Sequence, residues 1–585
     1  MSAPSLLDAL WRSGALRTLD HALAQSLRRL DPATPDAVLA AAALASLAVA
    51  NGHAGFDLAS PRTLVDAPDI PWPDADAWRR ELESSRWVAV PADGAEVSDA
   101  DRPLVLEGAP GAPGLLYLRR YREYERRVAA GLQRIAAPRG PGSDADADAD
   151  ADARDTITGG VDLVTGGPGT GKTTTIARML VQLVEQARAA GRADPRIALA
   201  APTGRAAERM AESVRNALQA IAAEGTAADV VGALPTSGST LHRLLGTIPD
   251  SPRFRHDADN PLPFDVVVVD EASMIDLPLM AKLVEAVPDG ARLVLIGDPD
   301  QLPSVEAGDV LSGILHGAEA GRDAFPARRT HLTHAWRQHA ALQLAPLAAA
   351  VRAGDSAAAL SLLRSGELSG VHFHEGLADP LQPPHRDRLL EYWRALADAA
   401  SPAEALRLAS HLRLLTAVRE GPQGARTLNA RIEAMLGAGG AGAPGGPHFH
   451  GRLLLVTENS YRHRLFNGDI GICFRDPGTD GAIMAWFPGA TPAAPRAFHP
   501  AALPAHDSAF AMTVHKAQGS EFDEVWLLLP QHDSRVLSRE LVYTGITRAR
   551  HALHVAANAE VTGVGLGRHA SRWSKLAWRL EGAQS

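Results

Sequence analysis

Cysteine is almost absent from this sequence, and that scarcity excludes several classes of protein. The 585 residues include one cysteine, Cys473, so neither an internal disulfide framework nor a thiolate-rich metal cluster can form. No run of about 18 apolar residues occurs, which argues against a membrane-spanning helix. The first residues, Met1 to Pro4, lack the basic and apolar segments of a signal peptide. We therefore expect a cytoplasmic protein.

An excess of basic charge is also missing. The formal net charge is −10, which argues mildly against a protein that coats nucleic acid over its whole surface. A local basic groove stays possible, because binding depends on where the charges lie and not on their sum. Apolar residues make up 46% of the chain, as in an ordinary globular protein, and the length predicts three or four domains.

The segment 166–173, Gly-Gly-Pro-Gly-Thr-Gly-Lys-Thr, is the most informative motif that is present. It follows an apolar run at 161–164 that predicts a strand, and it precedes a segment that predicts a helix. Glycines let backbone N–H groups turn around a polyphosphate, and the helix N-terminus adds partial positive charge. The predicted phosphate-binding residues are Gly166, Gly167, Pro168, Gly169, Thr170, Gly171, Lys172, Thr173 and Thr174. We expect Lys172 to reach the β- and γ-phosphates and Thr173 to ligate Mg²⁺.

Two carboxylates follow a run of four valines at 266–269, which predicts a fully buried strand. In a phosphate-loop protein this position is the magnesium and water site. Asp270 is expected to hold the metal together with Thr173, and Glu271 to orient and deprotonate the attacking water. A glutamate here favours hydrolysis over transfer to a small acceptor.

Further polar residues follow the next predicted strands. Gln301 lies where it would hydrogen-bond the γ-phosphate, and Arg337 lies beside an expected interdomain cleft. Arg548 is the natural arginine finger, because its rigid guanidinium stabilises charge on the transferring phosphoryl group. Thr203, after the strand at 197–201, is a weaker candidate for a contact to a nucleic-acid phosphate.

Alternating strands and helices predict an α/β fold with parallel sheets. An arginine-dense stretch at 115–132 predicts a helix, either a solvated connection or a basic patch, and the Asp-Ala repeat at 144–153 predicts disorder. The expected organisation is a helical N-terminal docking domain (1–125), a linker (126–160), a first α/β domain (161–345, with a small insert at 245–263), a second α/β domain (346–436 and 504–585) and a small β insertion (437–503).

Taken in order, these segments resemble the motif set of superfamily 1 helicases over roughly 165–550. Asp-Glu-Ala-Ser-Met at 270–274, with Gly-Asp-Pro-Asp-Gln-Leu-Pro at 297–303, is similar to the 5′→3′ branch, SF1B. Stretches at 51–58, 116–121 and 415–424 resemble more closely the RecD family, the alpha subunits of exodeoxyribonuclease V (RecBCD). The segment 465–471 resembles the SH3-like insert of that group.

The resemblance implies two RecA-like domains, an SH3-like insertion and an ATP- and Mg²⁺-dependent 5′→3′ DNA helicase for double-strand break repair and homologous recombination. It implies partnership with the beta and gamma subunits, with the nuclease centre on the beta subunit, in the bacterial cytoplasm and on the nucleoid during action. By the same resemblance, Thr203, His515 and Lys516 touch single-stranded DNA, while Gln301, Arg337, Gln518 and Arg548 link the two nucleotide-facing lobes.

Three alternatives stay open. The chain could act as a free-standing RecD-like helicase, as a 5′→3′ RNA helicase, or as a regulatory subunit whose nucleotide site only switches conformation. The family also places an adenine-reading glutamine some twenty residues before the phosphate loop; here that region holds the Asp-Ala repeat and no glutamine, so no adenine-reading residue is assigned.

Overall fold

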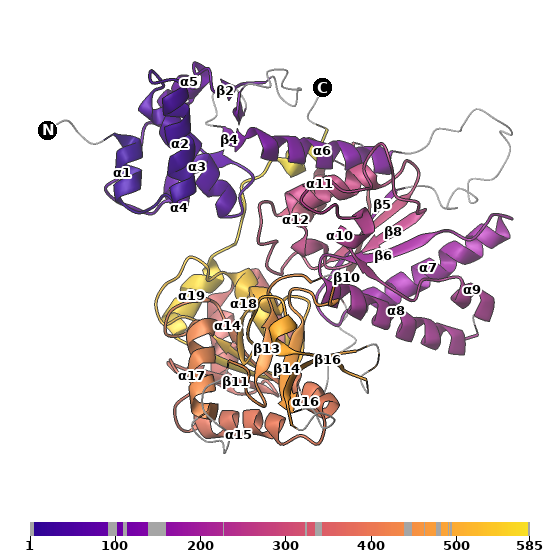
Figure 1. Ribbon diagram of the computed structural model, residues 1–585. Coiled ribbons are helices and arrows are strands. Elements are labelled where there is room, and N and C mark those ends of the chain that lie inside the picture. Colours follow the sequence, from indigo (N-terminus) through magenta and orange to yellow (C-terminus); the bar gives the residue numbers. More distant parts are fainter. Residues whose placement is uncertain are drawn as a thin grey trace.

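The computed structural model shows three bodies (Figure 1): an N-terminal domain and two α/β lobes. It describes residues 5–91, 102–108, 114–137, 160–225, 227–321, 324–333, 342–437, 447–460, 462–475, 481–489, 491 and 494–582. The Asp-Ala repeat and Arg337 lie outside these residues, so those two predictions stay untested. None of the described helices is both long enough and apolar enough to cross a bilayer.

The N-terminal domain is helical, as predicted, and also carries a small sheet in the order β1-β4-β3-β2. Its elements are α1 (Leu6–Arg12), α2 (Thr18–Leu30), α3 (Asp36–Ala50), β1 (Phe56–Asp57), α4 (Pro61–Leu64), α5 (Ala75–Glu83), β2 (Val88–Ala89), β3 (Leu104–Glu107) and β4 (Leu115–Leu118). Helix α3 is surrounded by protein, because every residue from Val38 to Ala48 is buried. This burial explains its alanine-rich composition without a polar face.

Lobe 1 is built on a six-stranded parallel sheet in the order β10-β5-β9-β8-β6-β7. Its strands are β5 (Gly160–Gly166), β6 (Ile197–Ala201), β7 (Ser239–Thr240), β8 (Val266–Val269), β9 (Arg292–Gly297) and β10 (Arg328–Leu332). Its helices are α7 (Lys172–Ala189), α8 (Gly204–Ala223), α9 (Ala228–Gly232), α10 (Leu241–Leu245), α11 (Leu277–Ala286) and α12 (Val310–Ala320), with a 3-10 turn at Ala272–Met274.

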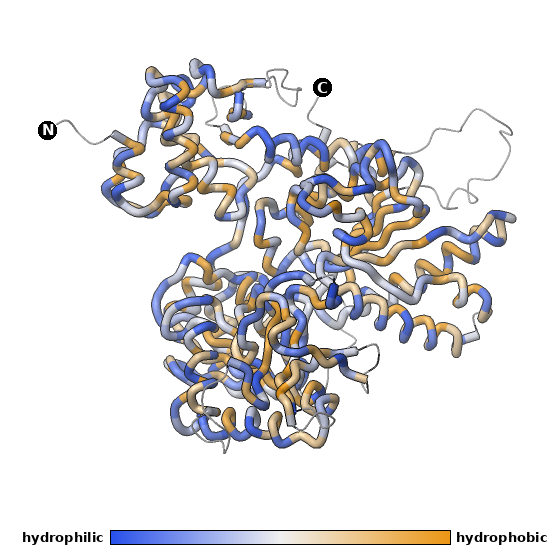
Figure 2. Tube along the Cα trace, in the orientation of Figure 1, coloured by the Kyte–Doolittle hydropathy of each residue, from blue (hydrophilic) through white to orange (hydrophobic). Residues whose placement is uncertain are grey.

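The valine run of β8 faces two apolar cores, one on each side of the sheet. Val266 and Val268 pack in the core formed with α7 and α8, whereas Val267 and Val269 pack in the core formed with α11 and α12. The prediction of a fully buried strand is therefore confirmed. Figure 2 shows these strands as an apolar layer between the helices.

Lobe 2 has a five-stranded parallel sheet in the order β11-β20-β19-β12-β18. Its strands are β11 (Val371–Glu375), β12 (Leu412–Thr416), β18 (Ala511–Thr513), β19 (Phe522–Leu528) and β20 (Ala549–Ala557), with a 3-10 turn at His515–Ala517. Its helices are α13 (Ala345–Ala353), α14 (Ser356–Ser365), α15 (His385–Ala397), α16 (Pro402–Ala409), α17 (Ala425–Gly437), α18 (Arg539–Ile546) and α19 (Ala559–Gly567).

A small antiparallel sheet, in the order β16-β15-β14-β13-β17, lies between α17 and β18 in the chain. Its strands are β13 (Leu453–Val456), β14 (Ile470–Arg475), β15 (Ile483–Phe487), β16 (Arg496–Phe498) and β17 (His506–Ser508), with a 3-10 turn at Pro500–Ala502. The predicted strands near 453, 470 and 482 are present, whereas the SH3-like class of the insertion stays a prediction.

The C-terminal strap, residues 568–582 with α20 (Leu576–Leu580), leaves lobe 2 and runs back to lobe 1 and the N-terminal domain (Figure 1). Leu576 and Leu580 join the core that contains α11 and α12. Trp573 stacks on His53 at a centroid distance of 4.2 Å, and its carbonyl accepts the N–H of Ala54 at 2.8 Å. The strap therefore fastens the N-terminal domain to lobe 1.

A buried ionic network crosses the same contact. The Glu107 carboxylate accepts from Arg122 at 2.9 Å and pairs with Arg579, while Arg579 also lies 3.4 Å from Glu125, and all four side chains have no exposed surface. Burial alone would raise the pKa of Glu107, but Arg579 and Arg122 hold that pKa below its usual value.

The prediction for 115–132 was therefore wrong in two respects. Residues 115–118 form strand β4, and the helix α6 (Arg119–Ala136) begins only after it. Arg122 is neither solvated nor available to nucleic acid, because it lies inside the ionic network. Gly131 of α6 lets α11 approach closely: a Cβ atom there would lie 2.5 Å from Val284. The helix is thus part of the lobe 1 core.

We predict that Arg579→Met lowers the free energy of unfolding by about 3–5 kcal/mol, because two buried carboxylates lose a shared cation. Urea unfolding followed by tryptophan fluorescence measures the loss. Arg364→Met is the control, since Arg364 pairs with Glu375 at the surface and its removal should cost less than about 1 kcal/mol. Equal losses in the two variants would contradict the importance of the network.

A second prediction concerns pH. Burial and the nearby Arg572 lower the pKa of His53 to about 4, and its Nδ1 accepts the N–H of Trp573 at 3.1 Å. The unfolded chain, with an ordinary histidine pKa of about 6.5, binds more protons between these values, so stability is lost as pH falls. From pH 7.5 to 5 we expect this residue to contribute a loss of about 1–2 kcal/mol.

Urea unfolding at both pH values tests this contribution. His53→Asn keeps a side-chain acceptor but does not titrate in this range, so its unfolding free energy should depend less on pH. An unchanged pH dependence in this variant would show that other groups are responsible.

Candidate nucleotide and DNA site

The phosphate loop connects β5 to α7, as the sequence predicted. Gly169 and Gly171 have φ of +75° and +82°, a region that favours glycine, and Gly171 precedes the first turn of α7. The Thr170 hydroxyl donates to the Gly167 carbonyl at 2.8 Å. Lys172 Nζ donates to the carbonyls of Gly166 at 2.5 Å and Gly167 at 3.0 Å. The amino group thus lies over the loop that is expected to hold the phosphates.

Asp270 and Glu271 follow β8 at the same edge of the sheet as the loop, because parallel strands end on one side. Glu271 has φ of +53°, which is uncommon for a residue with a side chain, and its N–H donates to Asp270 Oδ1 at 2.8 Å. Burial, and then the charge of Glu271, raise the pKa of Asp270 to about 6 against the opposing charges of Lys172 and Arg209.

One cavity of about 550 Å³ brings most of the predicted catalytic residues together. Its lining from lobe 1 includes the loop residues Pro168 to Thr174, Asp270, Glu271 and Gln301, and its lining from lobe 2 includes Arg548. Gln301 Nε2 donates to Asp298 at 3.2 Å. Arg548 is buried and donates to the carbonyls of Thr544 at 3.0 Å and Ser520 at 3.3 Å. Arg337 lies outside the described residues.

The residues of this cavity fit Mg²⁺ and a triphosphate. A threonine hydroxyl and carboxylate oxygens, from Thr173 and Asp270, are the ligand types that Mg²⁺ prefers. Lysine, arginine and the N-terminus of α7 supply the positive charge that a polyphosphate needs. Both sets face the same cavity.

The two lobes meet beside this cavity through buried hydrogen bonds. The Leu302 N–H donates to Thr544 Oγ1 at 2.8 Å, and the Leu302 carbonyl accepts from Gln518 Nε2 at 2.8 Å. Tyr543 donates its hydroxyl proton to Asp298 at 3.0 Å. Gln518 was expected to link the two lobes, and it does contact lobe 1 through the Leu302 backbone.

The predicted DNA contacts lie on both lobes. Thr203 caps α8, its hydroxyl oxygen accepting the Ala206 N–H at 3.2 Å. His515 and Lys516 line a separate cavity of about 590 Å³, and Lys516 Nζ donates to Asp507 at 3.0 Å. The loop after Lys516 reaches Thr203, because a Cβ atom on Gly519 would lie 3.9 Å from the threonine hydroxyl.

Two arginines in that cavity, Arg419 and Arg426, were not predicted from the sequence as DNA contacts. Val305 of lobe 1, which is 70% exposed, lines the same cavity. The arginines follow β12 at the carboxyl edge of the lobe 2 sheet, at the same edge as His515 and Lys516 after β18. Their position at this shared edge could have indicated from the sequence that the two arginines lie near His515 and Lys516.

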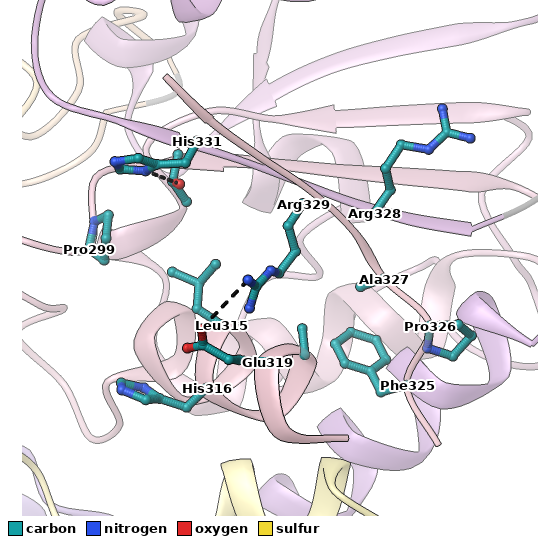
Figure 3. A pocket seen from close by; sticks show the side chains of 12 residues that line it. Pro299, Leu315, His316, Glu319, Phe325, Pro326, Ala327, Arg328, Arg329 and His331 are labelled. Atoms are coloured by element: carbon teal, nitrogen blue, oxygen red, sulfur yellow. Dashed lines mark hydrogen bonds and ion pairs between the residues drawn. The ribbon is translucent and has the colours of Figure 1, made fainter. Parts of the chain in front are cut away.

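A further cavity, of about 700 Å³, lies between β10 and α12 (Figure 3). Arg329 faces Glu319 across it at 3.7 Å, and His331 Nδ1 lies 2.9 Å from the Thr165 hydroxyl. It touches the strand before the phosphate loop only at Thr165 and contains none of the predicted site residues.

The close packing around Gly166 in the phosphate loop predicts that adding a methyl group there weakens nucleotide binding. A Cβ atom on Gly166 would lie 2.7 Å from both the Leu332 carbonyl oxygen and Thr170 Oγ1, so Gly166→Ala must displace the loop. We expect it to weaken binding of a fluorescent ATP analogue about tenfold or more, in line with overpacking costs of about 1–3 kcal/mol. Gly160→Ala, with nothing within 4 Å, should bind normally. Equal affinities would contradict a rigid loop.

Comparison with known proteins matches three parts of the chain to family models: the RecBCD enzyme subunit RecD, N-terminal domain, at 12–110; an AAA domain at 150–307; and a UvrD-like helicase C-terminal domain at 508–556. The RecBCD enzyme subunit RecD of Mycobacterium tuberculosis is 39% identical over 99% of this chain and 98% of its own length. The corresponding subunit of Mycolicibacterium smegmatis is 38% identical over 99% of this chain and all of its own length.

More distant relatives include the ATP-dependent RecD2 DNA helicase of Deinococcus radiodurans, which is 30% identical over 79% of this chain and 58% of its own length. Among solved structures, Bacteroides Pif1 bound to ssDNA aligns with 69% of this chain and 90% of its own, at 17% identity and a TM-score of 0.35. The full-length identity to the mycobacterial proteins decides the assignment: the chain belongs to the family of the RecBCD enzyme subunit RecD.

Proposed function

We propose that this protein is the ATP-hydrolysing 5′→3′ DNA helicase subunit of an exodeoxyribonuclease V, which unwinds duplex DNA ends for double-strand break repair and homologous recombination. One observation carries the proposal: Arg548 of lobe 2 lines the same cavity as Lys172, Asp270 and Glu271 of lobe 1. A cavity with hydrolytic groups on one wall and an arginine on the other is what a nucleotide-driven two-lobe motor requires.

The residues divide the work of hydrolysis. The loop N–H groups and Lys172 hold the phosphates, and Glu271 orients the attacking water and takes its proton. Mg²⁺, held by Thr173 and Asp270, supplies charge neutralisation on the phosphates when bound. Arg548 stabilises negative charge on the transferring group from the opposite wall, and Gln301 holds the γ-phosphate oxygen. We expect Arg337 to assist Arg548.

A cavity of about 530 Å³ on the other side of the phosphate loop is a suitable place for the adenine base. It is lined by Leu332 and Tyr543, among others, and includes loop residues Gly167 to Thr170. Apolar and aromatic surfaces suit a flat base. The cavity suits a nucleotide base of any kind, and the assignment of ATP follows from the family resemblance.

Hydrolysis would drive movement because the DNA contacts belong to both lobes. Thr203 is on lobe 1, whereas His515 and Lys516 are on lobe 2, so a change in the interlobe contact moves one set relative to the other. The lobes close with the γ-phosphate held between Lys172 and Arg548 and reopen after its loss. The 5′→3′ direction follows from the similarity to SF1B helicases.

The partners we propose are the beta and gamma subunits, docked on the N-terminal domain. Among the described residues, no group of three or more histidine, cysteine, aspartate or glutamate side chains is arranged to hold a metal ion. We place the nuclease centre on the beta subunit by family resemblance. The site of action would be the bacterial cytoplasm, on the nucleoid.

A free-standing helicase like RecD2 is the second candidate, favoured by the 30% identity to that protein. Co-purification with the beta and gamma subunits from its own cell separates the two candidates. Stimulation of the ATPase by DNA or by RNA separates a DNA from an RNA helicase. A purely switching subunit is disfavoured, because both Glu271 and Arg548 line the cavity.

We predict that Lys172→Gln lowers the single-strand-stimulated ATPase of the full chain by at least about a hundredfold, because the phosphates lose their fixed cation. Unwinding should be lost to the same extent, while co-purification with the partner subunits continues. Unmodified protein should unwind 5′-tailed and not 3′-tailed duplexes.

Lys282→Gln is the matched control, since Lys282 pairs with Glu285 on α11 away from the cavity. It should keep full activity. Unwinding by the Lys172 variant, measured with the partner motor inactivated, would refute the assignment, and negligible ATP turnover by unmodified protein at saturating single-stranded DNA would favour the switching subunit.

A further inference from the structure

Arg209 joins the two lobes directly at the nucleotide cavity. It lies on α8 of lobe 1, and its guanidinium donates to the Gly519 carbonyl of lobe 2 at 2.5 Å and to Glu521 Oε1 at 2.9 Å. It also lines the cavity that contains Lys172, Glu271 and Arg548. The roles assigned above do not include Arg209, although its side chain spans the cleft that they share.

Glu521 is the acceptor at the centre of this contact. Its Oε1 takes the bond from Arg209, and its Oε2 accepts from Arg550 Nε of lobe 2 at 3.0 Å. The Glu521 side chain is 17% exposed; burial alone would raise its pKa, but Arg209, Arg548 and Arg550 lower that pKa to about 2. Glu521 is therefore charged at any working pH and attracts arginines from both lobes.

The contact also adjoins the segments expected to touch DNA. Gly519, whose carbonyl accepts from Arg209, follows Lys516 by three residues. Its backbone approaches Thr203, which caps the N-terminus of the helix that carries Arg209. A displacement of the loop 515–521 by a bound strand would thus reach Arg209 through two hydrogen bonds, one to the Gly519 backbone and one to the Glu521 side chain.

On the nucleotide side, Arg209 lies within the electrostatic field of the hydrolytic carboxylates. Burial would lower the pKa of its guanidinium, but Glu521, and then Glu271 and Asp270, raise it. Arg209 and Glu271 line the same cavity, so moving this cation changes the surroundings of the carboxylate that is expected to orient the attacking water. Burial lowers the pKa of Arg548, which Glu271 and Glu521 raise and the nearby charge of Arg209 lowers further.

We propose that Arg209 is a positioning residue that couples DNA binding to ATP hydrolysis: through Glu521 and the Gly519 carbonyl it transmits the position of the DNA-contacting loop 515–521 to Glu271 and Arg548. The inference rests on the proposed motor function. It assigns to Arg209 no contact with the triphosphate. Nucleotide affinity therefore stays with Lys172 and the phosphate loop, while the stimulated rate depends on the Arg209–Glu521 pair.

The test compares Arg209→Gln, Glu521→Gln and the double variant in the full chain. Each single variant should lower the kcat of the single-strand-stimulated ATPase about tenfold, within the usual range of coupling between sites. KM for ATP and the affinity for a fluorescent ATP analogue should change less than about twofold. The double variant should also lose about tenfold and not a hundredfold, because both changes break one pair.

Arg209→Lys should recover part of the rate, since lysine keeps the charge but cannot reach both acceptors with a rigid fork. Arg215→Gln is the matched control: Arg215 is an exposed residue of the same helix that donates to the Thr236 carbonyl, and its loss should leave stimulation unchanged. Losses that multiply to about a hundredfold in the double variant would show that Arg209 and Glu521 act independently, and would overturn the proposed coupling through this pair.

Full stimulation in Arg209→Gln would overturn this inference alone, and so would a loss confined to ATP affinity. If thermal unfolding shows that Arg209→Gln is misfolded, Glu521→Gln carries the same test from lobe 2, and its full stimulation would overturn the inference. If unmodified protein shows no stimulation by single-stranded DNA, the proposed motor function fails and this inference fails with it.

Discussion

Two hydrogen bonds between lobe 2 and the backbone of Leu302 in lobe 1 hold the walls of the nucleotide cavity together. Both polar groups of Leu302 are bonded to side chains of lobe 2, and Leu302 is buried. A buried backbone group without a partner costs about 1–3 kcal/mol, so the lobes cannot separate here unless water replaces Thr544 and Gln518. Because Gln301 precedes Leu302, the same contact holds Gln301 at the cavity that Arg548 enters from the other side.

These hydrogen bonds form a polar seam between the lobes. Because the contact there is polar, the two lobes can separate and meet again. A net hydrogen bond is worth about 0.5–1.5 kcal/mol, which is small enough for the binding and loss of a phosphate to outweigh. A large apolar interface would hold the lobes shut. Most of the apolar core residues are instead internal to one lobe: the lobe 1 sheet is covered on both faces by its own helices, and Leu302 of lobe 1 packs into the core of lobe 2. Rigid bodies joined by a polar seam suit a cycle of opening and closing.

Local patterns were sufficient where neighbours in sequence define the structure. The apolar runs at 161–164, 197–201 and 266–269 fall within β5, β6 and β8, and the carboxyl edge of a parallel sheet explains why Lys172 and Glu271 meet. Composition could not reveal pairs formed at long range. In the sequence, Arg122 looks like one of several surface arginines. In the structure it is buried against Glu107, which also pairs with the distant Arg579. Arg209 and Glu521 are 312 positions apart.

The C-terminal strap joins the N-terminal domain to lobe 1. Its helix α20 packs on α12 so closely that a Cβ atom on Gly317 would lie 2.6 Å from Leu580, and the Arg579 network ties the same region to α6 and β3. The N-terminal domain and lobe 1 therefore form one unit, with residues of both in a single core. Lobe 2 meets the N-terminal domain through Arg535, which donates to the Leu64 carbonyl at 2.9 Å at a partly exposed position. A partner docked on the N-terminal domain is thus fixed relative to Lys172 and Thr203. In the proposed motor, movement of lobe 2, with Lys516 and Arg548, would then be movement of DNA relative to that partner.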